Sequence, residues 1–230
     1  MEAYIIIFER FGNLILNGFY LTLYITFVSI IFGLILGLIL AVLKLYGPKF
    51  LRILSTFYIE IIRGTPMVVQ LFIIYFGLPS TGLIKFTPLT AAILGMGLNS
   101  AAYQAEYFRT AFLAIPTGQT DAALSIGMNR FKVIRYILLP QVIRIVIPAW
   151  TNELIALTQY SSLAMILTVM ELTSVAKFIG SKTFYYIQSF TIIAFIYVAI
   201  SIILTRFMLF FEKKLEIPGV SAAKGRTFSF

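Results

Sequence analysis

The chain contains no cysteine and no histidine, and only 12% of its 230 residues are charged. The lack of cysteine excludes a disulfide framework, and the lack of both residues excludes the usual zinc sites. Without histidine the commonest general base is also missing. Soluble domains carry about a quarter charged residues, so this scarcity of charge indicates an integral membrane protein. We expect no catalytic residue and no metal site in this chain.

Apolar residues make up most of the sequence. Hydrophobic residues account for 60% of the chain, and its mean hydropathy is +0.96. A transmembrane helix needs about 20 apolar residues, so this length suits an all-α unit with about five spans. The net charge of +9 could suggest a nucleic-acid-binding protein. The basic residues flank apolar segments, however, which is typical of orientation in a lipid bilayer, and we predict no nucleic-acid partner.

Five long apolar runs predict the spans. They cover residues 14–43, 53–78, 89–115, 134–157 and 190–211. A further apolar piece at 163–170 is too short to span, so we expect a re-entrant or surface element there, followed by an external connection at 171–188. Residues 1–215 would then form a single transmembrane domain. Residues 216–230 would form a polar C-terminal tail.

Small residues recur along the first run. Gly33, Gly37 and Ala41 are spaced four residues apart, which places them on one helix face. Such a face lets another helix approach closely in a membrane, so we expect tight helix packing there.

The basic residues predict the orientation of the chain. Most of them cluster after the first run, between the third and fourth runs, and after the fifth run. The positive-inside rule places this side in the cytoplasm. With an odd number of spans, the N-terminus would lie outside and the C-terminus in the cytoplasm.

The most informative segment is the polar, basic-rich island at residues 121–140, which reads DAALSIGMNRFKVIRYILLP. A few polar residues would be enough to turn the chain between two spans. An island of this length predicts a surface that binds a partner on one side of the membrane. Ala122 and Ala123 would let that partner approach closely.

A short helix is predicted at the start of the island. Thr117 or Gly118 is expected to cap it, with Asp121 in the first turn, where the helix dipole favours an acidic side chain. Gly127 suits the position just after the helix end. The simpler interpretation is an ordinary capped loop helix, and the functional interpretation is a docking helix.

The island matches a known pattern of an acidic residue, two alanines, a later glycine and then Ile-x-Leu-Pro. The matching positions are Asp121, Ala122, Ala123, Gly127, Ile137, Leu139 and Pro140. This spacing resembles the EAA loop of ATP-binding cassette (ABC) importer permeases, with Asp121 in place of the usual glutamate. Three further stretches resemble the polar amino acid permeases of that family, and the likeness spans roughly residues 12–215. They are IIRGTPMVVQLF at 61–72, NSAAYQAEYFRTA at 99–111, and NEL at 152–154 followed by SSL at 161–163.

The resemblance implies an all-α integral membrane protein with the five-transmembrane-helix ABC importer permease fold, in a prokaryotic cytoplasmic membrane. It implies three protein partners: a separate ATPase subunit, an extracytoplasmic solute-binding protein and a second permease chain, in a homodimer or a heterodimer. No cofactor would bind this chain, and ATP and Mg would bind the ATPase; the chain contains no GxxxxGK[ST] motif. Asp121, Ala122, Ala123 and Gly127 would couple the two subunits.

Polar side chains within the runs are the candidate residues for binding a polar amino acid. They are Gln70, Asn99, Tyr103, Glu106, Glu153, Gln159 and Ser161. A charge at membrane depth costs about 2.5–3.5 kcal/mol on insertion scales, so such residues usually face protein or a water-filled cavity. Asn99, Tyr103 and Glu106 stand at i, i+4 and i+7, on one helix face.

Structural interpretations of the charged residues stay open. Glu106 could pair with Arg109 three residues later, and Glu60 could pair with Arg63. For Glu60 and Arg63 we favour this ion pair, because the sequence places them near the cytoplasmic end of their span. Glu106 and Glu153 could serve either role.

Two further alternatives concern the substrate and the energy source. Related permeases often carry a lysine in the stretch 158–162, where this chain has Gln159 instead, so the case for an acidic substrate is weak. The alternative function is a transporter or channel driven by an ion gradient, without an ATPase.

Overall fold

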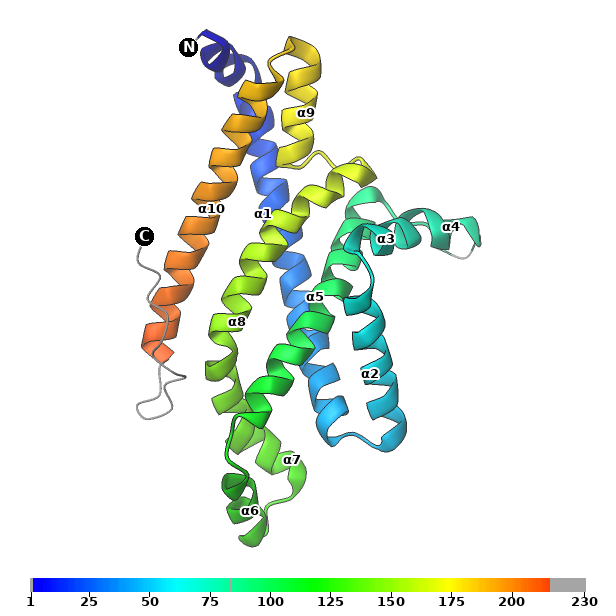
Figure 1. Ribbon diagram of the computed structural model, residues 1–230, viewed down its shortest axis with the longest axis vertical. Helices are drawn as coiled ribbons and strands as arrows, with labels where there is room; N and C mark the ends of the chain where they lie inside the picture. Colours follow the sequence, from blue (N-terminus) through cyan, green and yellow to red (C-terminus); the bar gives the residue numbers. More distant parts are fainter. Residues whose placement is uncertain (1, 83, 216–230) are drawn as a thin grey trace.

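The computed structural model describes residues 2–82 and 84–215, and every regular element in this part of the chain is helical. Four long helices run along the long axis of the molecule (Figure 1). They are α1 (Glu2–Tyr46), α5 (Pro88–Leu113), α8 (Leu139–Tyr160) and α10 (Tyr186–Leu215). The all-α fold class is confirmed. The predicted polar tail at 216–230 lies outside the described residues.

Shorter helices connect the long ones. They are α2 (Lys49–Gly64), α3 (Met67–Phe72), η1 (Ile73–Gly77), α4 (Leu78–Ser80), α6 (Thr117–Ser125), α7 (Arg130–Val133), η2 (Ile134–Leu138), η3 (Ser161–Leu167) and α9 (Leu172–Thr183). The segments η1 and η2 are π-helical, and η3 is a 3-10 helix. Most of the piece at 163–170, which we expected to be too short to span, lies in η3, which follows α8 directly and belongs to the candidate span Arg130–Leu167.

Judged by length and composition, fewer segments of the structure could cross a membrane than the five that the sequence predicts. Three segments are long and apolar enough to cross a membrane, at Glu2–Tyr46, Arg130–Leu167 and Tyr186–Leu215; the bent pair Lys49–Gly64 and Met67–Ser80 would make a fourth. Helix α5 is not among them, although it has 26 residues. Polar residues are interspersed along its sequence, which lowers its mean hydropathy. The count of five spans stays a prediction.

Two predicted runs differ from the helices of the structure, and the predicted external connection contains a helix. The first helix begins at Glu2, twelve residues before the expected start. The second run is not straight, because the chain breaks before Pro66 and bends by 108° between α2 and α3. Proline disfavours helical backbone angles at the residue before it, which explains the break. The expected external connection contains a helix, α9, whose first N–H groups are capped by the buried carboxylate of Glu171.

The predicted small-residue face of α1 packs against α5. A Cβ atom added to Gly33 would lie 2.7 Å from Gln104 Nε2, and one added to Gly37 would lie 2.9 Å from the Ala101 carbonyl oxygen. Ala41 is fully buried on the same face. The prediction of tight packing is confirmed. This close contact with α1 places α5 at the centre of the bundle.

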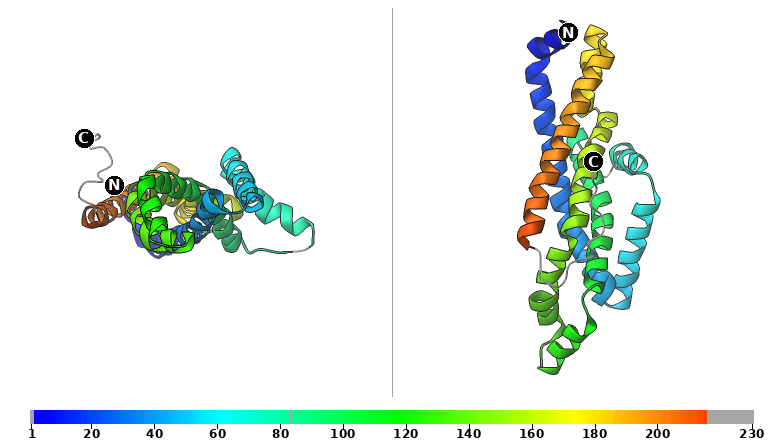
Figure 2. Two further views of the ribbon diagram at one scale, coloured as in Figure 1. Left: turned by 90° about the horizontal axis from the view of Figure 1, so that it is seen from below. Right: turned by 60° about the vertical axis from the view of Figure 1, so that its left-hand side comes forward.

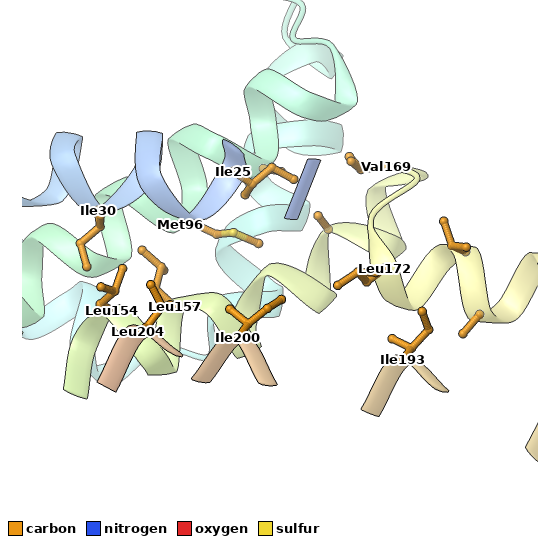
Figure 3. Packing of buried hydrophobic residues seen from close by; sticks show 14 of the residues in the cluster. Ile25, Ile30, Met96, Leu154, Leu157, Val169, Leu172, Ile193, Ile200 and Leu204 are labelled. Carbon is orange, nitrogen blue, oxygen red and sulfur yellow. The ribbon is translucent and has the colours of Figure 1, made fainter. Parts of the chain in front are cut away.

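Two apolar clusters hold the helices together. The larger one joins α1, α5, α8, η3, α9 and α10 (Figure 3), and includes Ile25, Ile30, Met96, Leu154, Leu157, Leu172, Ile200 and Leu204. The smaller one includes Ala41, Phe108, Ala123, Val133 and Val142. Because this second cluster contains residues of α6 and α7, it fixes the island to the body of the bundle.

The two ends of the bundle carry different elements. The start of α1 and α9 lie at one end, and α6 lies at the opposite end (Figures 1 and 2). This arrangement agrees with the predicted placement of the N-terminus and the island on opposite sides. Which end faces the cytoplasm stays a prediction.

Candidate functional site

Helix α6 begins differently from its prediction. Its first residue is Thr117, it follows Pro116, and no side chain caps it. Asp121 is therefore the fifth residue of the helix and lies beyond its first turn. The predicted cap by Thr117 or Gly118 and the dipole contact of Asp121 are wrong, because proline already presets the chain direction at this start.

Helix α6 ends as predicted. Gly127 has a φ of 86°, in the left-handed region that glycine adopts without a steric penalty. The Gly127 N–H donates to the Leu124 carbonyl at 3.0 Å, and the Met128 N–H donates to the Ala123 carbonyl at 3.1 Å. These two bonds form a Schellman motif, which satisfies the last carbonyls of the helix.

The exposed surface of α6 differs from the one that the motif suggests. Asp121 and Ala122 are exposed, whereas Ala123 is only 3% exposed and packs inside the smaller cluster. The prediction that Ala123 faces a partner is therefore wrong. Ile126 and Phe131 are instead 79% and 73% exposed. Neither of these large apolar residues belongs to the motif, which directs attention to its small residues.

A hydrogen bond ties α6 to the start of α8. Gln141 Nε2 donates to Gln119 Oε1 at 2.6 Å and to the Ile137 carbonyl at 2.8 Å. Together with the burial of Ala123, this contact fixes α6 to a long helix of the bundle. A force applied to α6 would therefore reach α8.

Among the candidate solute-binding residues, Glu106 forms ion pairs with two cationic side chains. Lys44 Nζ lies 2.6 Å from Glu106 Oε1, and Arg109 Nε lies 2.8 Å from Glu106 Oε2. The pairing with Arg109 agrees with the structural interpretation, and Lys44 was not foreseen. The carboxylate links α1 to α5, which favours a structural role.

Gln70 and Asn99 bond to each other. Asn99 Nδ2 donates to Gln70 Oε1 at 3.0 Å, and Gln70 Nε2 donates to the Ile62 carbonyl at 2.8 Å and to the Thr65 carbonyl at 3.1 Å. Both amides are buried. Gln70 satisfies carbonyls that the helix break frees between α2 and α3, and Asn99 holds the Gln70 amide in place, so these contacts stabilise the bend.

Tyr103 contacts a cation of α2. The Arg63 guanidinium carbon lies 5.3 Å from the centre of the Tyr103 ring. The expected Glu60–Arg63 ion pair is absent from the described residues. The expected position of Arg63 is also wrong, because α2 begins at Lys49 and Arg63 stands in its last turn, at the far end.

Glu153 lies in a polar cluster between α5 and α8. Its Oε1 accepts from Ser100 Oγ at 2.7 Å, and its Oε2 accepts from the Tyr107 hydroxyl at 3.2 Å. Gln104 Nε2 donates to Ser100 Oγ at 3.0 Å, and Trp150 Nε1 donates to Gln104 Oε1 at 3.0 Å. We call these five residues the Glu153 cluster.

The Glu153 cluster combines burial with an unmatched charge. Glu153 is 8% exposed, and no lysine or arginine among the described residues forms an ion pair with it. Neutral hydroxyls compensate a buried carboxylate only in part, so a cationic group would bind favourably there. Ser100, Gln104 and Tyr107 were missed by sequence reasoning. They repeat the i, i+4, i+7 spacing of the predicted face, one residue further along.

The two remaining candidates lie further along the chain. Gln159 is exposed near the end of α8, and Ser161 is fully buried and donates to the Thr158 carbonyl at 2.6 Å. Gln159 stands roughly 9 Å along the helix from Glu153, at 1.5 Å per residue. Neither residue forms a hydrogen bond with the Glu153 cluster in the described part of the chain.

A cavity of about 400 Å³ lies between α1, α5, α8 and α10 and borders the Glu153 cluster at Trp150. Its lining is apolar or aromatic: Leu34, Leu38, Phe108, Ile143, Val146, Ile147, Trp150, Phe207, Met208, Phe211 and Leu215. No carboxylate or amide lines it, so it does not suit a polar solute.

Comparisons with known proteins place this geometry in context. Residues 33–217 match the family model of the binding-protein-dependent transport system inner membrane component. The chain is 42% identical over 200 residues to the probable amino-acid ABC transporter permease protein YckA of Bacillus subtilis, covering 87% of this chain and 88% of that protein. It is 37% identical over 202 residues to the arginine transport system permease protein ArtQ of the same organism, covering 88% and 92%. A crystal structure of an amino acid ABC transporter with histidines superimposes with a TM-score of 0.83 at 34% identity, covering 90% and 96%.

Proposed function

The chain belongs to the family of binding-protein-dependent transport system inner membrane components, and from that membership we propose that it carries a polar amino acid across the cytoplasmic membrane. It is the membrane-spanning permease subunit of an ABC importer, as its amino-acid permease relatives are. These relatives favour an ATP-driven mechanism over the alternative of an ion-gradient-driven transporter or channel.

A partner ATPase would drive the cycle through α6. ATP and Mg would bind that subunit. The exposed Asp121, Ala122 and Ile126 would contact it, and the buried Ala123 would hold α6 to the bundle. Closure of the ATPase would move α6 and the attached α8, which would switch the bundle between inward and outward openings. This is alternating access around a site within the membrane.

Two further partners complete the proposal. An extracytoplasmic solute-binding protein would deliver the amino acid, and a second permease chain would enclose the path, in a homodimer or a heterodimer. The protein would be a multi-pass component of a prokaryotic cytoplasmic membrane, with its N-terminus outside and its C-terminus inside. The separation of the start of α1 from α6 agrees with placing the N-terminus and the island on opposite sides of the membrane, and the basic residues suggest which side is the cytoplasm.

The observation that carries the substrate class is Glu153. Its carboxylate is buried at membrane depth and is bonded only by neutral donors. The α-ammonium group of an amino acid, or a cationic side chain, would supply the missing positive charge. Glu106 is less suited to this role, since Lys44 and Arg109 already neutralise it.

The test compares two neutralised carboxylates in the reconstituted complex of permease, ATPase and solute-binding protein. Glu153→Gln should reduce amino-acid-stimulated ATP hydrolysis and uptake while basal hydrolysis persists. A charged hydrogen bond contributes about 1.5–3 kcal/mol, so we expect a loss of about ten- to a hundred-fold in apparent affinity. Glu106→Gln should instead lower thermal stability with little change in amino acid dependence. Wild-type amino acid dependence in Glu153→Gln would refute the assignment of this site.

A further inference from the structure

Arg63 is an exposed cation in the last turn of α2. It lies roughly 21 Å along α2 from Lys49, at 1.5 Å per residue, and the hydrocarbon layer is about 30 Å thick. Its side chain is exposed on the surface of the chain. An arginine facing lipid at such depth is costly, so its face of α2 must meet water or protein in the working complex.

No carboxylate neutralises Arg63 within residues 2–82 and 84–215. Both ion pairs in this part of the chain belong to Glu106. The Arg63 guanidinium carbon lies 5.3 Å from the centre of the Tyr103 ring. A cation–π contact orients a guanidinium but leaves its N–H donors free for an anionic ligand.

Consecutive turns of α5 bring Arg63 and Glu153 to the same region. Tyr103 holds the cation of α2, and Tyr107, one turn later, donates to the carboxylate of Glu153 at 3.2 Å. The two tyrosines are about 6 Å apart along the helix axis. An unmatched cation and an unmatched anion therefore lie on one side of α5 without pairing with each other.

We propose that Arg63 binds the α-carboxylate of the transported amino acid and thereby determines specificity for α-amino acids over amines that lack a carboxylate. This inference rests on the proposed function and extends it from Glu153, the partner of the ammonium group. A planar guanidinium forms two parallel hydrogen bonds with a carboxylate, which a lysine cannot reproduce. The bent α2–α3 segment, held by Gln70, fixes the position of Arg63.

The experiment measures binding to the detergent-solubilised permease–ATPase complex without the solute-binding protein, so that only the membrane site discriminates. The protein amino acids are first screened by thermal shift on the wild-type complex. Each binder is then compared with its methyl ester by calorimetry, which gives a ratio of acid to ester affinity. We expect the wild-type complex to prefer the acid by about ten- to a hundred-fold.

Arg63→Gln should abolish this preference by weakening the acid while leaving the ester unchanged. Glu60→Gln is the matched control, because it removes an exposed charge one turn earlier on α2 and should keep the wild-type ratio. Arg63→Lys should retain part of the preference for the acid. If Arg63→Gln does not assemble, the acid-to-ester ratio of Arg63→Lys serves as the test instead.

The outcomes separate this inference from the function on which it depends. An unchanged acid-to-ester ratio in Arg63→Gln, or in Arg63→Lys if only that variant assembles, would overturn the role of Arg63 while leaving the importer assignment intact. An equal loss of the acid-to-ester ratio in Glu60→Gln would also overturn the role of Arg63, because the loss of any charge on α2 would then have the same effect. If no amino acid binds the wild-type complex or stimulates it in the complete system, the proposed function itself fails.

Discussion

Replacing Gly37 with alanine is expected to destabilise the contact between α1 and α5. The added Cβ would lie 2.9 Å from the Ala101 carbonyl oxygen, 2.9 Å from Gln104 Cβ and 3.1 Å from the Ala105 nitrogen. Carbon contacts are optimal near 3.5–4.0 Å, so the two helices would have to separate by about half an ångström. Two of these neighbours are backbone atoms, which cannot rotate away.

The magnitude follows from two opposing effects. Overpacking of this kind costs about 1–3 kcal/mol, and replacing a mid-helix glycine with alanine returns about 0.5–1 kcal/mol. We therefore expect the free energy of unfolding to fall by about 0.5–2 kcal/mol. Gly12→Ala is the matched control on the same helix, since an added Cβ there meets nothing within 4 Å. It should be neutral or slightly stabilising.

The assay is unfolding of the purified chain in mixed micelles, with both variants measured beside the wild type. A Gly37→Ala protein as stable as Gly12→Ala would refute the close approach of the two helices. A decrease in Gly37→Ala alone would support it, because both substitutions make the same chemical change on one helix.

Two further predictions concern the exposed end of α6 and a strained residue. Ile126→Asp should detach the ATPase without lowering thermal stability, because Ile126 is 79% exposed; co-purification of the two subunits measures this. Asn129→Asp is the control: it adds the same charge nearby and retains a helix cap, so this variant should still bind the ATPase. An intact complex in Ile126→Asp would argue against docking at this surface. Thr168→Gly should raise the free energy of unfolding by about 1 kcal/mol, because Thr168 has a φ of 67°, where a side chain is strained. A loss of stability on chemical unfolding would contradict this explanation.

The sequence alone determined features that depend on composition or on neighbouring residues. The scarcity of charged residues identified a membrane protein. The four-residue spacing of Gly33 and Gly37 predicted a close helix contact, and Gly127 predicted a helix end. The first of these properties is a composition of the whole chain, and the other two depend on residues within a few turns of one another, so the sequence contains the necessary information.

The tertiary structure decided which polar groups meet. Glu106 pairs with Lys44, 62 residues away, and Glu153 accepts from Ser100, 53 residues away. The helical spacing of Asn99 predicted a shared face with Glu106, but Asn99 bonds to Gln70 of another helix. Spacing within one helix gives the direction of a side chain and says nothing of the helix that lies opposite.

Burial also required the assembled bundle. Ala123 fits the coupling motif as well as Ala122 does, yet only Ala122 is exposed, because α6 packs one side against α7 and α8. Arg63 was assigned to the wrong end of its helix, because the sequence did not show where α2 begins and bends. The partner of a charge in a membrane protein depends on how separate helices pack, and that packing is decided by contacts between residues far apart in the chain.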